Sequence, residues 1–226
     1  YSGDGGETLA KLTDDGAAEL YHNNTKRIET SSTGVDITGA FTATDGCTIT
    51  TADNTTQLTL TSTDADSGVG PRLDLKRDSG SPADNDALGR VRFLFDNDAA
   101  QETEAILFTG IVSDVSDGTE DAKFTIATMI DGTNRERVAM THTEVVFNDD
   151  SIDSDFRVES DGNANALLVD ASTNNVLIGS TEVAPRNLSS GAGIRLGTDG
   201  SIEAAKATAE PARFNRTGDD GEVIQI

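Results

Sequence analysis

Eight Asp-Gly pairs punctuate the 226-residue chain, and these turn signals limit most strongly what the sequence can fold into. Asp-Gly favours tight hairpin turns, because both central residues of such a turn need positive φ. The spacing of the pairs therefore predicts many short strands joined by tight turns. The pairs begin at Asp4, Asp15, Asp45, Asp117, Asp131, Asp161, Asp199 and Asp220.

Apolar and polar residues alternate over short runs between these turn signals. The runs include residues 33–50, with Val35, Ile37 and Phe41, and residues 57–61 (Gln-Leu-Thr-Leu-Thr). Such a period of two is typical of strands with one buried face, and threonine favours strands because its branched Cβ packs well on them. The only helix-compatible stretch, residues 203–210 before Pro211, is too short to be stable alone. The sequence therefore predicts an all-β fold.

Three regions differ in the size of their apolar side chains. Residues 1–70 are rich in Thr, Ser and Gly and predict a thin β segment. Residues 71–147 hold most of the phenylalanines and predict a five-stranded antiparallel meander. Residues 148–226 return to thin strands, which we expect to form a thin β shaft that leads to a missing C-terminal region.

The expected strands and core residues follow from the same patterns. The meander strands are predicted at residues 72–77, 88–95, 104–112, 122–130 and 136–140. The later strands are predicted at residues 156–159, 166–169, 175–178 and 222–226. Alternation along the meander predicts a core, and therefore the best-packed part of the chain, at Phe93, Phe95, Leu107, Phe108, Phe124, Ile126 and Met129.

Large apolar residues are too few for an ordinary globule of this length. Leu, Ile, Val and Phe supply 49 of 226 residues, or 22 %, while the net charge is −23. A content of roughly 20 % with high net charge is the composition of disordered chains. An ordinary domain of this size buries about 70 % of its unfolded surface. The chain is therefore either partly disordered or elongated, completing its core with copies of itself.

Charge and composition also exclude several functions. A net charge of −23 and a pI near 4.1 repel phosphate backbones, which argues against nucleic-acid binding. No run approaches the roughly 20 apolar residues of a membrane span, so we expect no membrane insertion. Cys47 has no intrachain partner for a disulfide, and His22 and His142 are too few for a zinc site. The first residue, Tyr1, follows no Met or signal peptide, so we expect a fragment or a processed chain.

Abundant carboxylates raise the question of a calcium site. Residues 161–165 (Asp-Gly-Asn-Ala-Asn) place oxygen ligands at alternate positions, as in the first half of a calcium loop. However, Ala166 stands where the loop needs glycine, and Ser172 stands where it needs glutamate. Residues 64–68 and 148–155 match the pattern just as loosely. We therefore interpret all three as turns and expect no metal or other cofactor.

Paired carboxylates also suggest glycan hydrolysis, for which two acids about 5–10 Å apart are needed. Asp96 with Asp98, or Glu102 with Glu104, would supply such a pair. A sugar site also needs aromatic platforms, whereas the chain has 4 % aromatic residues and no tryptophan. The sequence therefore predicts no catalytic residue.

Five runs resemble segments of tail-fibre and tailspike proteins of tailed bacteriophages, especially aquatic ones. They are residues 18–39, 73–89, 117–124, 168–179 and 214–226. Together they cover less than half of the chain but reach from one end to the other. The resemblance implies a homotrimeric, intertwined β fibre that attaches a virion to its host. It also implies that the chain, which stops inside an expected strand at Ile226, is a shaft segment.

These observations predict a structural virion protein without enzymatic activity: a segment of a trimeric phage tail fibre involved in host attachment. Its expected partners are its own copies, other virion tail proteins and a glycan or protein of the host surface. Its expected location is the virion tail appendage, assembled in the host cytoplasm. Two alternatives remain open. One is a polysaccharide-degrading tailspike enzyme with a groove between chains, and the other is a bacterial surface adhesin, which the lack of a secretion signal disfavours.

Overall fold

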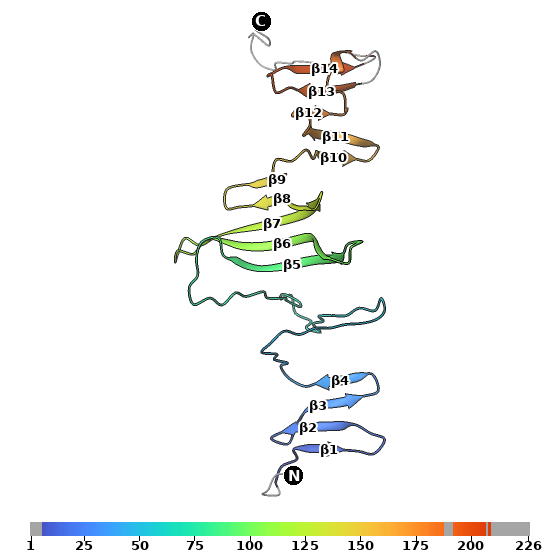
Figure 1. The fold of residues 1–226 in the computed structure, drawn as a ribbon, viewed down its shortest axis with the longest axis vertical. Coiled ribbons are helices and arrows are strands. Elements are labelled where there is room, and N and C mark those ends of the chain that lie inside the picture. The colour runs from blue at the N-terminus through green and yellow to red at the C-terminus, as the bar shows by residue number, and fades with distance from the viewer. Residues whose placement is uncertain (1–5, 188–191, 207, 209–226) are drawn as a thin grey trace. The chain divides into compact units, whose positions relative to one another are not determined.

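A computed structural model describes residues 6–187, 192–206 and 208 of the chain. Over these residues the protein is all-β, with three antiparallel sheets and a single 3-10 turn, η1 (Pro185–Asn187). The predicted fold class is therefore confirmed at this level. In each sheet the strands lie side by side in chain order (Figure 1). The chain divides into two compact units, Tyr1–Arg72 and Leu73–Ile226.

The first unit contains one sheet and the second unit contains two. The first sheet comprises β1 (Ala10–Leu12), β2 (Ala18–His22), β3 (Thr25–Ser31) and β4 (Gly34–Ile37). The second comprises β5 (Ala87–Asp96), β6 (Glu102–Asp114), β7 (Asp121–Ile130), β8 (Thr133–Met140) and β9 (Val145–Phe147). The third comprises β10 (Phe156–Ser160), β11 (Asn163–Asp170), β12 (Asn175–Ile178), β13 (Ala192–Leu196) and β14 (Ile202–Lys206).

Asp-Gly pairs lie in turns between neighbouring strands at five of the six places where the structure describes them. Only Asp131 and Gly132, between β7 and β8, both have positive φ, at 48° and 75°. At Gly118, Gly162 and Gly200 only the glycine does. The tight turn between β2 and β3 instead uses Asn23 and Asn24, with φ of 50° and 56°. The pairs mark turns as predicted, but most of these turns need only one left-handed residue.

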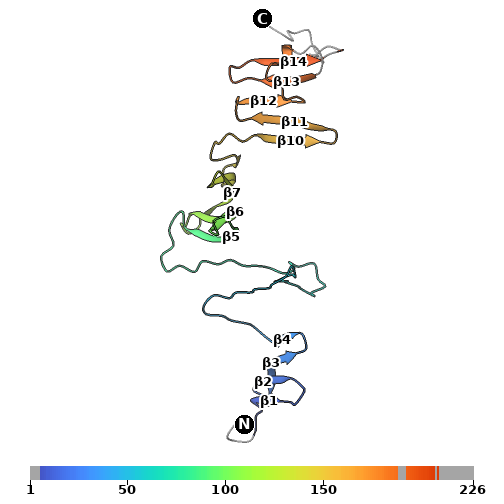
Figure 2. The same cartoon turned by 45° about the vertical axis from the view of Figure 1, so that its right-hand side comes forward.

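The central sheet is an antiparallel meander of five strands, but its strands differ from the prediction at both ends. Residues 72–77 form no strand, so that prediction is wrong for the single chain. The fifth strand is β9, a three-residue run that was too short for its alternation to be recognised. Residues 57–61 are also not a strand, because residues 38–86 contain none at all (Figure 2).

In the third sheet, β10, β11 and β12 lie where strands were predicted. The sequence did not indicate β13 and β14, since β14 lies in the alanine-rich stretch that resembled a helix. The strand predicted at residues 222–226 lies outside the described residues. No described helix is long and apolar enough to cross a membrane.

The predicted core is not buried in the single chain, so this prediction is wrong at that level. Phe93 is 53 % exposed, Phe95 47 % and Phe124 38 %, and the other four predicted core residues are only half-buried. The buried apolar residues of the sheets are instead Ala127, Ala139, Leu168 and Leu177. The physical reason is that nothing in the described part of the chain covers the sheet face that carries the phenylalanines.

A candidate assembly interface

Each sheet carries a row of apolar side chains that crosses all of its strands on one face. In the first sheet, Ala10, Leu20, Ile28 and Ile37 are cross-strand partners in this order. Cross-strand partners point to the same face of a sheet, so the four side chains form one stripe. Leu20 and Ile37 remain exposed in this stripe.

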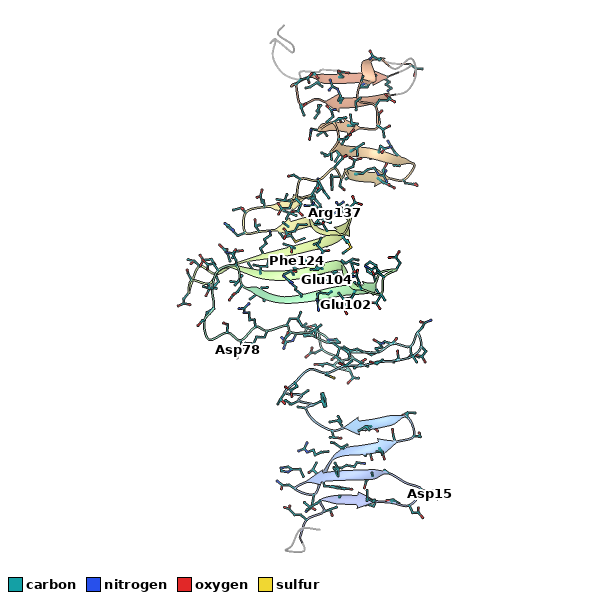
Figure 3. All side chains as sticks on the ribbon, viewed as in Figure 1. Asp15, Asp78, Glu102, Glu104, Phe124 and Arg137 are labelled. Atoms are coloured by element: carbon teal, nitrogen blue, oxygen red, sulfur yellow. The ribbon has the colours of Figure 1, made fainter. Side chains whose placement is uncertain are left out.

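The second sheet repeats this arrangement with larger side chains. Its row runs through Val91, Phe108, Ile126, Val138 and Phe147, one residue from each strand. Phe93 and Phe124 flank the row on the same face, with ring centroids 6.1 Å and 6.3 Å from that of Phe108. Figure 3 shows Phe124 on β7 in the middle of this sheet.

The third sheet carries a row that runs through Phe156, Val169, Val176, Leu196 and Ile202. It meets the row of the second sheet, because the rings of Phe147 and Phe156 lie 5.0 Å apart. The two rows therefore form one continuous surface over ten strands, which we name the apolar ribbon.

The face opposite the row is polar in the first sheet. Lys11, Glu19, Glu29 and Asp36 are cross-strand partners there, and Lys11 and Lys26 lie 3.6 Å and 3.5 Å from Glu19. The hydroxyl of Tyr21 donates to Glu19 at 2.8 Å, and with the two lysines it lowers the pKa of that carboxyl. This charged face is therefore suited to lie against solvent rather than against another apolar surface.

The chain itself covers the opposite face of the third sheet. Pro185 in η1 is fully buried, and a Cβ added to Gly193 would lie 2.5 Å from the Cβ of Ser180. Residues 180–187 thus pack against the side that carries Leu177, Arg195 and the buried Glu203. The segment that covers this sheet therefore lies on the face opposite the apolar ribbon and leaves the ribbon uncovered.

The balance of buried and exposed apolar residues follows from this arrangement. Among the residues that the structure describes, twenty-eight large apolar side chains are exposed, whereas only four apolar residues of the sheets are buried, two of them alanines. Isolated exposed apolar residues are ordinary, but contiguous apolar surfaces mark interaction sites. The apolar ribbon and the row of the first sheet are therefore the candidate functional surface of this protein.

One test of burial compares Phe124→Ala with Leu94→Ala. Phe124 lies on the apolar face and Leu94 on the opposite face, and their exposed fractions are similar, 38 % and 41 %. If other chains bury the ribbon, Phe124→Ala should lower the unfolding free energy by about 3–5 kcal/mol. We expect Leu94→Ala to cost less than about 1 kcal/mol. Urea unfolding at one protein concentration measures both, and equal small losses would show that the ribbon stays exposed.

The three candidate calcium segments serve as turns and connections. Asp161 and Gly162 form the turn between β10 and β11, and the side chain of Asn163 accepts from the Asn165 amide at 2.9 Å. In residues 64–68, each aspartate accepts from a backbone amide two residues later. In residues 148–155, Asp155 accepts from the Ala171 amide at 2.9 Å. In the part of the chain that the structure describes, no three His, Cys, Asp or Glu residues are grouped to hold a metal.

The acids proposed as pairs lie at the β5–β6 end of the second sheet, where Asp96 and Glu102 are cross-strand partners. Glu104 is occupied by an ion pair with Arg92 at 3.3 Å, and Figure 3 labels Glu102 and Glu104 on β6. A hollow of about 680 Å³ opens beside Phe147 and Phe156 and includes Asp170 in its lining. Asp170 accepts from the Ser172 hydroxyl at 2.6 Å, which lowers the pKa of its carboxyl. A glycosidase acid needs a raised pKa, so this carboxylate does not match that role.

Other turn aspartates behave like Asp170. Hydroxyl groups two residues later donate to Asp53, Asp114 and Asp199 and lower the pKa of each carboxyl. Because these pKa values fall on folding, the stability they add is present above the unfolded-state pKa. It is lost as the pH falls through the lower folded-state pKa.

Two residues considered for disulfide or zinc chemistry, Cys47 and His142, are both exposed. Cys47 is exposed in the strand-free segment, and His142 lies 4.0 Å from Asp121 at the surface of the second sheet. Arg137 on β8 donates to the Ser154 hydroxyl at 2.5 Å (Figure 3). No family model matches the chain, and neither a curated protein nor a solved structure proved similar to it.

Proposed function

We propose that this chain is a structural segment of a homotrimeric fibre of the tail-fibre type and that it works by assembly and adhesion rather than by catalysis. The observation that carries the proposal is the apolar ribbon, which is continuous over ten strands and uncovered by the described part of the chain. A second copy of the same face is a chemically matched cover for such a surface. The number of copies, three, comes from the resemblance to phage fibre segments.

The distribution of charge supports the same function. The rows are free of charge, whereas the opposite face of the first sheet carries ion pairs and the whole chain carries a net charge of −23. With the rows inside, this charge lies outside and keeps the particles soluble and apart. Burial of the rows between copies also supplies the core that the 22 % of large apolar residues do not form within one chain.

The native mass of the purified protein tests the assembly. Light scattering at micromolar concentration should give three times 23.6 kDa, because a chain that cannot close its own core is stable only with its copies. A folded, monodisperse species of one chain mass would contradict the proposal. Twice the chain mass would instead indicate a dimer, in which the apolar faces of two copies pack against each other.

The virion location and host attachment are proposals of the same kind. In this role the segment holds a receptor-binding tip away from the particle, joined to other tail proteins, and its exposed loops touch glycan or protein on the host. Gold-labelled antibody against the chain should decorate the tail appendages of particles that contain it. Labelling of bacterial cells without particles would instead favour the adhesin alternative.

The assembled protein should not cleave polysaccharide and should not need a metal. The physical reason is that the carboxyl beside the hollow, Asp170, has a lowered pKa whereas a glycosidase acid needs a raised one. Glu104 is occupied by an ion pair with Arg92. Incubation with polysaccharide of a confirmed host, with and without EDTA, is the measurement. New reducing ends that disappear when Glu102 and Glu104 are changed to Gln would overturn the fibre proposal in favour of the tailspike enzyme. Binding without cleavage supports the fibre.

A further inference from the structure

The segment between the first and second sheets, residues 39–82, has no backbone partners. Among the described residues, none of its amides or carbonyls takes part in a hydrogen bond between backbone groups. Arg77 near its end donates to the Ala87 carbonyl at 3.2 Å and forms an ion pair with Asp86 at 3.0 Å. Before Arg77 its side-chain bonds are local, such as those between Asp53 and Thr55. Figures 1 and 2 show it as a trace without arrows. A stretch of 44 residues without a single backbone pair is unusual, because most backbone groups in folded proteins are paired.

The same segment has the composition of strands. Leu58 and Leu60 alternate with threonine, and Leu73 and Leu75 alternate with polar residues. Neighbours two apart share one face of a strand, so each pair would form an apolar edge. All four leucines are exposed by 48–67 %. An extended, unpaired run of this kind is a template for pairing with another chain.

The low charge of this stretch indicates that the chain with which it pairs is another copy of the same protein. Only two of the residues 37–63, Asp45 and Asp53, are charged, whereas 25 % of the whole chain is. When identical chains pair around one axis, each residue lies beside its own copies, so every charge would face a like charge. A nearly neutral stretch in a chain of net charge −23 is therefore suited to pair with itself.

We infer that residues 39–63, the nearly neutral part of this segment, are a strand-exchange segment, which pairs in register with the same residues of neighbouring copies. This inference rests on the assembly proposed above and specifies where the backbones of the copies pair. The pairing supplies the hydrogen bonds that the segment lacks in one chain, and it buries Leu58 and Leu60 between copies. It also brings the Cys47 residues of the copies to one level of the assembly.

The unique thiol allows a direct test. Chains labelled at Cys47 with pyrene maleimide and refolded should show excimer emission, which requires two stacked pyrene rings. Dilution with unlabelled chains before refolding should abolish the emission. The control is Cys47→Ser with Asp36→Cys, which moves the label to the polar face of the first sheet. The control should show monomer emission only.

Two substitutions at adjacent residues test which face of the proposed strand is buried between copies. Leu58→Asp places a charge on the apolar edge, so it should raise the concentration for half-assembly at least about tenfold and remove the excimer. Thr59→Asp places the same charge on the water-facing side, where it meets only the like charges of its copies and stays solvated, so it should shift assembly much less than Leu58→Asp and keep the excimer. If both substitutions are without effect, the segment is a linker and the inference is wrong.

Hydrogen exchange of the unlabelled protein, with its mass measured in the same sample, separates the two proposals. In trimers, amides of residues 39–63 should exchange as slowly as those of β6 and β7. Trimers in which these amides exchange freely would overturn strand exchange while leaving the fibre proposal intact. A folded species of one chain mass would overturn both.

Discussion

Val91→Asp should dissociate the assembled protein into single chains. Val91 is 44 % exposed in the single chain and lies on β5 at the outer end of its row, so one chain tolerates an aspartate there. In the assembly the same carboxylate is buried without a partner, at a cost of at least about 3 kcal/mol. Since about 1.4 kcal/mol is a factor of ten, the concentration for half-assembly should rise at least about a hundredfold. Light scattering over a dilution series measures it.

Arg90→Asp is the matched control for this substitution. Arg90 is the preceding residue and is also exposed, but it points to the opposite face of the sheet. Arg90→Asp makes the net charge more negative than Val91→Asp does. If general repulsion between chains caused the effect, Arg90→Asp would therefore weaken assembly at least as much as Val91→Asp. If both variants shift assembly equally, the apolar face is not the interface.

Glu203→Ala should destabilise the third sheet strongly. The Arg195 and Glu203 side chains are 13 % and 8 % exposed and form an ion pair at 2.5 Å. Arg195 also donates to Asn175 at 3.1 Å and to Ser201 at 2.6 Å. Removal of the carboxylate leaves a buried guanidinium without its counter-charge, which costs about 3–5 kcal/mol. Urea unfolding at a fixed protein concentration measures the loss.

The control is Glu159→Ala on β10 of the same sheet. Glu159 forms an ion pair with Arg157 at 2.6 Å, but the two side chains are 56 % and 51 % exposed. Exposed pairs contribute at most about 1 kcal/mol, so we expect a small loss. Similar losses for Glu159→Ala and Glu203→Ala would mean that the Arg195 guanidinium is not buried in the assembled protein.

The local fold could be predicted from the sequence where pattern and turn chemistry agree. Alternation around Phe93, Phe108 and Phe124 placed three strands of the second sheet and the face that their phenylalanines share. The turn at Asp131 and Gly132 was equally readable, since its geometry requires two residues with positive φ. β14 was not, because its alanines fit a helix and only pairing with β13 makes it a strand.

The candidate interface could be predicted only in part. The sequence indicated that large apolar residues were too few for one chain, so that the chain was either partly disordered or completed its core with copies of itself. It did not show that Phe147 and Phe156 touch and join two rows into one ribbon, because this contact depends on the path of residues 148–155. It also predicted a strand at residues 57–61, where the single chain offers no backbone partner.

The chain order of the strands has a consequence for how the protein folds. Every described strand pairs only with its neighbours in sequence, so each sheet forms through local contacts. Local pairing of this kind is fast and independent of concentration, whereas burial of the apolar faces requires chains to meet. Refolding should therefore show a fast unimolecular phase in circular dichroism, followed by a slower phase whose rate rises with protein concentration. Between the two phases the apolar faces of the sheets are exposed to solvent, and the chains are most prone to aggregate during this interval.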